Sequence, residues 1–204
     1  MGYEPIDAWY EEQQEAISNR LVEEYRDSDE YAEGLSRAIE DFVSERQKNT
    51  KIFISYRRDE AEEEADRLYN GLCRHFDHNQ IFRDIDSIEP GEDFVEVIQH
   101  AVGCCNILIA IIGKTWLNIT DNIGFRRLDN PEDFVRLEIA TALERNILVI
   151  PVLIQGAKMP DSRELPETLV KLGRRHALEF TSDGWEHEVG GLIQTLKSAI
   201  TKSI

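Results

Sequence analysis

Two apolar runs constrain the fold of this 204-residue chain more than any other feature. Residues 106–112 read Asn-Ile-Leu-Ile-Ala-Ile-Ile, and residues 147–153 read Ile-Leu-Val-Ile-Pro-Val-Leu. Because neither run has a polar face, each is expected to be a strand covered on both sides within a parallel sheet. Parallel strands need crossover connections, which are usually helical, so the surrounding sequence has to supply helices.

The remainder of residues 51–204 supplies them in strict alternation. Further short strands are predicted at 51–56, 81–82 and 177–180. Apolar residues at helical spacing predict helices at 61–76, 94–101, 131–145 and 185–200. This alternation predicts an α/β fold with an open, flavodoxin-like, doubly wound parallel sheet, in which ligands bind beyond the carboxyl ends of the strands.

The start of the helix before residues 147–153 is predicted from four residues. Asn130 is a favoured N-cap, Pro131 suits the first helical position, and Glu132 and Asp133 favour the positive end of the helix dipole. We therefore expect this helix to begin at Pro131 and to end near Arg145.

Residues 1–50 form a segment of different composition, with 14 acidic and 5 basic residues. Helical spacing of apolar residues predicts two amphipathic helices, a break near residues 26–29 and a polar connector at 45–50. Two short helices cannot bury their apolar stripes alone. This all-helical segment is therefore expected to dock on the domain at 51–204 or on another chain, and we favour a helical hairpin that promotes assembly.

Charge and hydropathy exclude several partner classes. The formal net charge of −17 repels nucleic-acid phosphates and anionic lipids, so neither nucleic acid nor a membrane surface is an expected partner. No apolar run approaches the roughly 20 residues that span a bilayer. The acidic start of the chain also lacks the regions of a signal peptide.

The thiols and imidazoles predict a cytoplasmic protein without a metal site. Cys73, Cys104 and Cys105 are odd in number, two of them adjacent, which is not the pattern of a disulfide framework. The five histidines form no Cys/His pair at zinc-ligand spacing.

Two nucleotide- and phosphate-handling classes are rejected on missing residues. A two-component receiver needs an acidic pair after its first strand and an Asp ending its third, where this chain has Arg57-Arg58 and Gly113-Lys114. A P-loop nucleotidase needs a Gly-rich Gly-Lys-Ser/Thr sequence, which the chain lacks.

Three segments carry a family resemblance. They are the strand Ile-Phe-Ile-Ser-Tyr-Arg at 52–57, the strand and acidic turn at 82–93, and the helix Asp-Phe-Val-Arg-Leu-Glu at 133–138 with the strand after it. In this order they resemble the Toll/interleukin receptor (TIR) domain family as it occurs in bacteria, across roughly residues 51–200. The resemblance leaves residues 1–50 unexplained.

The resemblance implies cleavage of NAD, which serves as substrate and not as cofactor. Some TIR domains split nicotinamide from ribose, by hydrolysis or cyclisation, and carry an aromatic residue, usually Trp, four positions before a catalytic Glu. Here these positions hold Phe134 and Glu138. A spacing of four places both on one helical face. Alternatively, Glu138 is one of many solvated acids on a helix.

Other candidate ligand contacts follow strands. Ser55, Tyr56 and Arg57 end the first strand, where the first two could line a nucleotide pocket and Arg57, or Arg58 beside it, could clamp a diphosphate. Phe82 and Trp116 could stack on a base. The alternatives are a turn serine, a surface arginine pair and two core aromatics.

The acidic turn at 84–91 is the candidate assembly loop, with Ile85 and Ile88 available to a neighbouring copy. Its simpler explanation is a helix entry capped by Ser87 or Asp93. The resemblance implies an enzyme activated by homotypic self-association, with a role in bacterial defence against phage. The rival hypothesis is a non-catalytic signalling adaptor, for which the Phe at position 134 is the best sequence argument.

Overall fold

A computed structural model describes residues 15–17, 19–20, 29–83 and 91–202 of the chain. The chain divides into two compact units, Met1–Gln47 and Lys48–Ile204, which are described separately. No helix among the described residues is both long and apolar enough to span a bilayer.

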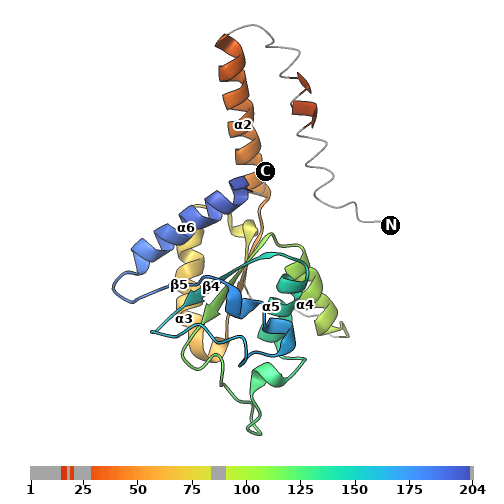
Figure 1. Cartoon of the computed structure of the whole chain (residues 1–204), viewed down its shortest axis with the longest axis vertical. Helices are drawn as coiled ribbons and strands as arrows, with labels where there is room; N and C mark the ends of the chain where they lie inside the picture. Colours follow the sequence, from red (N-terminus) through yellow and green to blue (C-terminus); the bar gives the residue numbers. More distant parts are fainter. Residues whose placement is uncertain (1–14, 18, 21–28, 84–90, 203–204) are drawn as a thin grey trace. The chain divides into compact units, whose positions relative to one another are not determined.

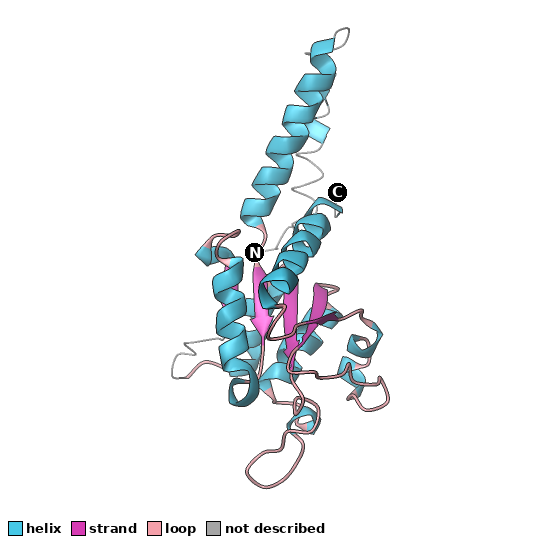
Figure 2. Cartoon of the chain, turned by 90° about the vertical axis from the view of Figure 1, so that its left-hand side faces the viewer, coloured by secondary structure: helices cyan, strands magenta, loops and turns pink. Residues whose placement is uncertain are grey.

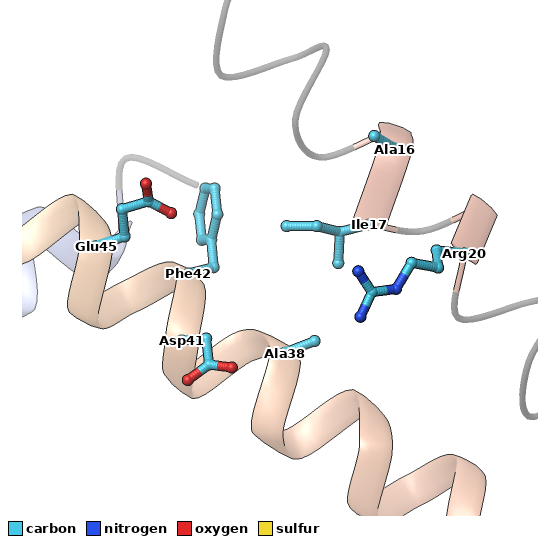
Figure 3. Close-up of a pocket in the computed structure, with 7 residues that line it drawn as sticks. All are labelled: Ala16, Ile17, Arg20, Ala38, Asp41, Phe42 and Glu45. Carbon is cyan, nitrogen blue, oxygen red and sulfur yellow. The ribbon is translucent and has the colours of Figure 1, made fainter.

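The first unit is helical where it is described. Residues 15–17 and 19–20 are helical, and α2 begins at Asp29 and continues to Asn49. The boundary between the two units falls within the predicted connector at 45–50, most of which is helical. A cavity of about 290 Å³ lies between the two segments, with Ile17 directed toward α2 (Figure 3). Most of the predicted first helix lies outside the described residues, so the hairpin stays a prediction.

The second unit is built on a five-stranded sheet, and the predicted doubly wound parallel fold is confirmed. The strands are β1 (Ile52–Ser55), β2 (Ile81–Arg83), β3 (Ile107–Ile112), β4 (Leu148–Leu153) and β5 (Leu178–Glu179). All neighbours pair in parallel in the order β2-β1-β3-β4-β5. The order in which successive strands are added reverses between β1 and β3. This is the switch point at which such sheets bind ligands.

Helices cover both faces of this sheet, as Figures 1 and 2 show. One face packs on α3 (Arg58–Leu72) and α6 (Trp185–Lys202). The other packs on α4 (Phe94–Gly103) and α5 (Phe134–Glu144). Because side chains alternate along a strand, Ile52 and Ile54 of β1 enter the first layer and Phe53 enters the second.

The start of α5 differs from the prediction. The helix begins at Phe134, with Asp133 as N-cap accepting a hydrogen bond from the backbone N–H of Arg136. Asn130 instead accepts the backbone N–H of Glu132 in a turn that precedes the helix. The α4 entry follows one of the predicted alternatives, because Asp93 accepts the backbone N–H of Val95 as N-cap.

Candidate active site

Glu138 lies at the inner face of α5 and is only 7% exposed. Its Oε2 atom accepts a hydrogen bond of 2.6 Å from the Ser55 hydroxyl at the end of β1. This length is in the range of charge-assisted O–H···O⁻ bonds. Glu138 is therefore not a solvated surface acid but a buried carboxylate held at the carboxyl edge of the sheet.

A buried ion pair lies beside this contact. The Arg57 guanidinium donates from both terminal nitrogens to Asp133, at 2.9 and 3.0 Å, with side-chain exposures of 0% and 2%. Arg127 also contacts Asp133, at 3.3 Å, and reaches Asp59 at 3.0 Å. Arg57 is thus a buried partner of Asp133 and not a surface residue, while its role as a diphosphate clamp stays a prediction.

An aromatic pair lies one helical turn from Glu138. The Phe134 ring is 45% exposed and stacks on Phe94, with centroids 5.2 Å apart and an interplanar angle of 29°. Each ring belongs to the first residue of its helix, directly after a capping aspartate. Sequence reasoning missed Phe94, although Asp93-Phe94 repeats the cap-then-aromatic pattern of Asp133-Phe134.

Three other predicted contacts lie elsewhere. Trp116 is fully buried, so its ring is not accessible to a stacking base, in contrast to the prediction. Tyr56 is half-buried and packs against the core of α3 and α6, on the opposite face of the sheet from Glu138. Phe82 lies on the edge strand level with Phe53, with the Lys51 ammonium 5.8 Å from the centroid of its exposed ring.

A cavity lies at the same edge of the sheet. A cavity of about 700 Å³ lies at the carboxyl ends of β3 and β4, lined in part by Gly113, Lys114, Gly156 and Lys158. Glu60, in the first turn of α3, accepts hydrogen bonds at this edge from the backbone N–H and the hydroxyl of Thr115. The cavity is large enough for a small-molecule ligand.

The thiols and acids suggest neither a nucleophile nor a metal ligand set. Burial raises the pKa of the Cys105 thiol to about 12, which keeps it protonated at neutral pH. Cys104 lies on α4's terminus with its sulfur 3.6 Å from Nδ1 of His100. Within the described part of the chain, no group of three or more His, Cys, Asp or Glu side chains could hold a metal ion. The absence of a metal centre stays a prediction.

Comparison of the sequence with known families identifies the domain that carries this site. Residues 52–193 match the TIR domain family. The chain belongs to the TIR domain family. The match spans all five strands and the helices α4 and α5, so the resemblance of residues 51–200 is confirmed at family level. A bacterial origin of this TIR domain stays a prediction.

Two solved structures are similar to this TIR domain, and the first of them supports the fold. The TIR domains of the activated Roq1 resistosome directly recognizing the pathogen effector XopQ are 14% identical, with a TM-score of 0.50, and the match covers 72% of this chain and 99% of that one. A metazoan TIR-STING receptor from C. gigas, in complex with 2',3'-cGAMP, is 20% identical with a TM-score of 0.46. That match covers 68% of this chain and spans 38% of the receptor chain. No curated protein sequence matches the chain.

Proposed function

We propose that this TIR domain cleaves NAD between nicotinamide and ribose, with Glu138 as the catalytic residue. One observation carries the proposal: Glu138 is a buried carboxylate held by Ser55 at the carboxyl edge of the sheet, where doubly wound folds bind ligands. The half-exposed ring of Phe134 lies on the same helical face and offers a flat apolar surface to a base or to nicotinamide.

The chemistry fits a single carboxylate. Breaking the ribose–nicotinamide bond builds oxocarbenium-like positive charge at the anomeric carbon, which a nearby carboxylate stabilises or attacks, as in glycoside hydrolysis. Nicotinamide leaves as a neutral group from a cationic ring, so the step needs no general acid. Ser55 contributes by fixing one oxygen of Glu138 through its hydroxyl.

The biological setting of the proposed reaction rests on the family resemblance. We infer activation by homotypic TIR–TIR association in the cytoplasm, with NAD depletion or a cyclic nucleotide as the signal in antiphage defence. Residues 84–90 of the candidate assembly loop at 84–91 lie outside the described residues, so its role in assembly stays a prediction.

A non-catalytic signalling adaptor is the second candidate, and one observation favours it. Ile123 and Phe125 are 78% and 69% exposed at the tip of the segment between β3 and α5. Asp121 fixes this tip by accepting the backbone N–H groups of both residues. An ordered apolar tip is typical of a surface that binds another protein. An adaptor would tolerate the loss of Glu138, whereas the enzyme would not.

Nicotinamide release from NAD by the purified full-length chain tests the proposal, at high protein concentration and with a crowding agent. Glu138→Gln preserves the shape of the side chain and removes its charge, so we expect release to fall by at least about 100-fold. Glu144→Gln, on an exposed position of the same helix, is the matched control and should retain wild-type activity.

Two outcomes would contradict this function. If Glu138→Gln releases nicotinamide as fast as the wild type, Glu138 is not catalytic. If neither protein releases nicotinamide even when crowded, the adaptor is the better description of this TIR domain.

A further inference from the structure

A chain of four charged residues links β1 to the start of α5. At its centre, Arg57 and Asp133 form a two-pronged pair that is almost fully buried. At its outer end, Arg127 bridges Asp133 to Asp59 in the first turn of α3, and both Arg127 and Asp59 are partly exposed. These residues come from three segments, the start of α3, residue 127 and the cap of α5, so the network exists only in the folded domain.

Asp133 has a second task in the same place. Its Oδ1 atom accepts the backbone N–H of Arg136 at 3.0 Å, which caps α5, while both oxygens also receive Arg57. One carboxylate therefore joins the end of β1 to the first turn of α5. Glu138 follows on the next turn of that helix, and its own partner, Ser55, lies two residues before Arg57.

Thus the end of β1 and the N-cap of α3 each hold α5 at one point. Ser55 contacts the carboxylate of Glu138, and Arg57 contacts the cap of the helix that carries it. Apolar packing of Val135, Ile139 and Ala142 holds the body of α5 on the sheet. The contact of Arg57 with Asp133, five residues before Glu138, fixes the start of the helix.

We propose that the Arg57–Asp133 pair is the positioning device for the catalytic carboxylate Glu138. The proposal rests on the proposed function and deepens it, because it assigns Arg57 a role in aligning Glu138 and none in binding the NAD diphosphate. Neither residue touches the reacting atoms, so both are positioning residues.

Stability alone is a poor explanation for this pair. Burying two charges costs desolvation energy that their attraction often only offsets, and apolar residues of similar volume frequently serve as well. Arg57 Nε is also buried without a hydrogen-bond partner among the described residues, a further cost. What an apolar pair would not provide is the fixed, planar geometry of a guanidinium on a carboxylate.

The first test is Asp133→Ser in the full chain. Serine keeps an oxygen that can cap α5 but removes the partner of Arg57. Displacement of Glu138 by a fraction of an ångström to about 1 Å should lower kcat by roughly 10–100-fold. The KM for NAD should change by less than about threefold, since no substrate contact is removed. Arg127→Gln removes a contact at the partly exposed end of the network, so it should lower kcat only a few-fold.

Asp161→Ser is the matched control. Asp161 also pairs with an arginine through both oxygens and accepts a backbone N–H, but it does so with Arg163 on an exposed loop. The kcat of the Asp161→Ser variant should equal that of the wild type. A rise in KM with unchanged kcat in Asp133→Ser would overturn the proposal, because it would mean that the pair serves substrate binding.

The variant Leu68→Ala is the control that separates a loss of stability from a loss of Glu138 alignment. Leu68 is fully buried in the core on the opposite face of the sheet from Glu138. Each variant is assayed at a temperature where circular dichroism shows it folded. If Leu68→Ala, at an equal loss of thermal stability, lowers kcat as much as Asp133→Ser, the pair acts only through stability and the proposal fails.

A measurement that needs no activity completes the test. Amide hydrogen exchange at Leu137 and Glu138 should accelerate at least about tenfold in Asp133→Ser and stay unchanged in Asp161→Ser. Unchanged exchange in both would overturn the positioning role. If the wild type releases no nicotinamide, the proposed function fails, while the exchange result still decides whether this pair holds α5.

Discussion

At the scale of single residues, the contact between Ser55 and Glu138 is the most consequential one in the domain. A carboxylate that is 7% exposed has lost most of its hydration, and the Ser55 hydroxyl replaces part of it at 2.6 Å. Hydrogen bonds to charged groups contribute about 1.5–3 kcal/mol to stability. Ser55 is therefore expected to support both the fold and the proposed reaction.

Ser55→Ala should lower the free energy of unfolding by about 1–3 kcal/mol, because it removes a hydrogen bond to a buried carboxylate. Urea denaturation of the full chain measures this change, and nicotinamide release should fall in the same variant. Thr195→Ala is the control, since its hydroxyl bonds the Gly191 carbonyl on an exposed face of α6. Equal stability of the two variants would show that Ser55 contributes no more than a surface hydroxyl.

The same scale shows where sequence reasoning stops. Glu138 could be found because its spacing from Phe134 is local and carries a family pattern. The burial of Arg57 could not, because it depends on Asp133, 76 positions away in the chain. The stacking of Phe94 on Phe134 was equally hidden, since it requires knowing that α4 and α5 are neighbours.

At the scale of elements, the strands were predictable and one helix start was not. Both long apolar runs are β3 and β4, because a run without a polar face is stable only inside the sheet. For α5, Asn130 and Pro131 satisfy the local rules for a helix start. The helix begins at Phe134, three residues after the predicted start at Pro131. There Asp133 both caps α5 and binds Arg57.

Two glycines give opposite predictions at this scale. A Cβ at Gly113, just after β3, would lie 2.4 Å from Cδ of Glu60, whereas one at Gly190 in α6 meets nothing within 4 Å. Gly113→Ala should destabilise the domain by about 1–3 kcal/mol by displacing Glu60 from Thr115. Gly190→Ala should stabilise it by about 0.5–1 kcal/mol through helix propensity.

Thermal or urea unfolding of the two variants decides this. If Gly113→Ala is as stable as the wild type, Glu60 moves aside freely and its contact with Thr115 does not tie the first turn of α3 to the end of β3.

At the scale of the whole molecule, the chain joins a TIR domain to a helical unit of strongly acidic character. In α2, Leu35 and Ile39 are exposed, although they lie on one helical face. An exposed apolar pair on a long helix is expected to form a binding surface. Under the assembly hypothesis for residues 1–50, this surface binds another copy of the chain.

Light scattering compares the full chain with a chain that begins at Lys51. We expect the full chain to have the larger mass per particle relative to its monomer at high concentration, because the helical segment supplies apolar surface for association. If both proteins are monomers, or associate equally, residues 1–50 do not promote assembly. Leu35→Glu with Ile39→Glu tests the same surface without deletion.

The hydrogen bond between Ser55 and Glu138 also limits how early in synthesis the proposed site can form. Its two residues are separated by 83 positions, so at about 5–20 residues per second a ribosome needs roughly 4–17 seconds to make the second after the first. During that interval the nascent chain has the hydroxyl but not the acid, and the proposed site does not exist. An NAD-consuming activity would then be withheld from every copy whose synthesis has not reached Glu138.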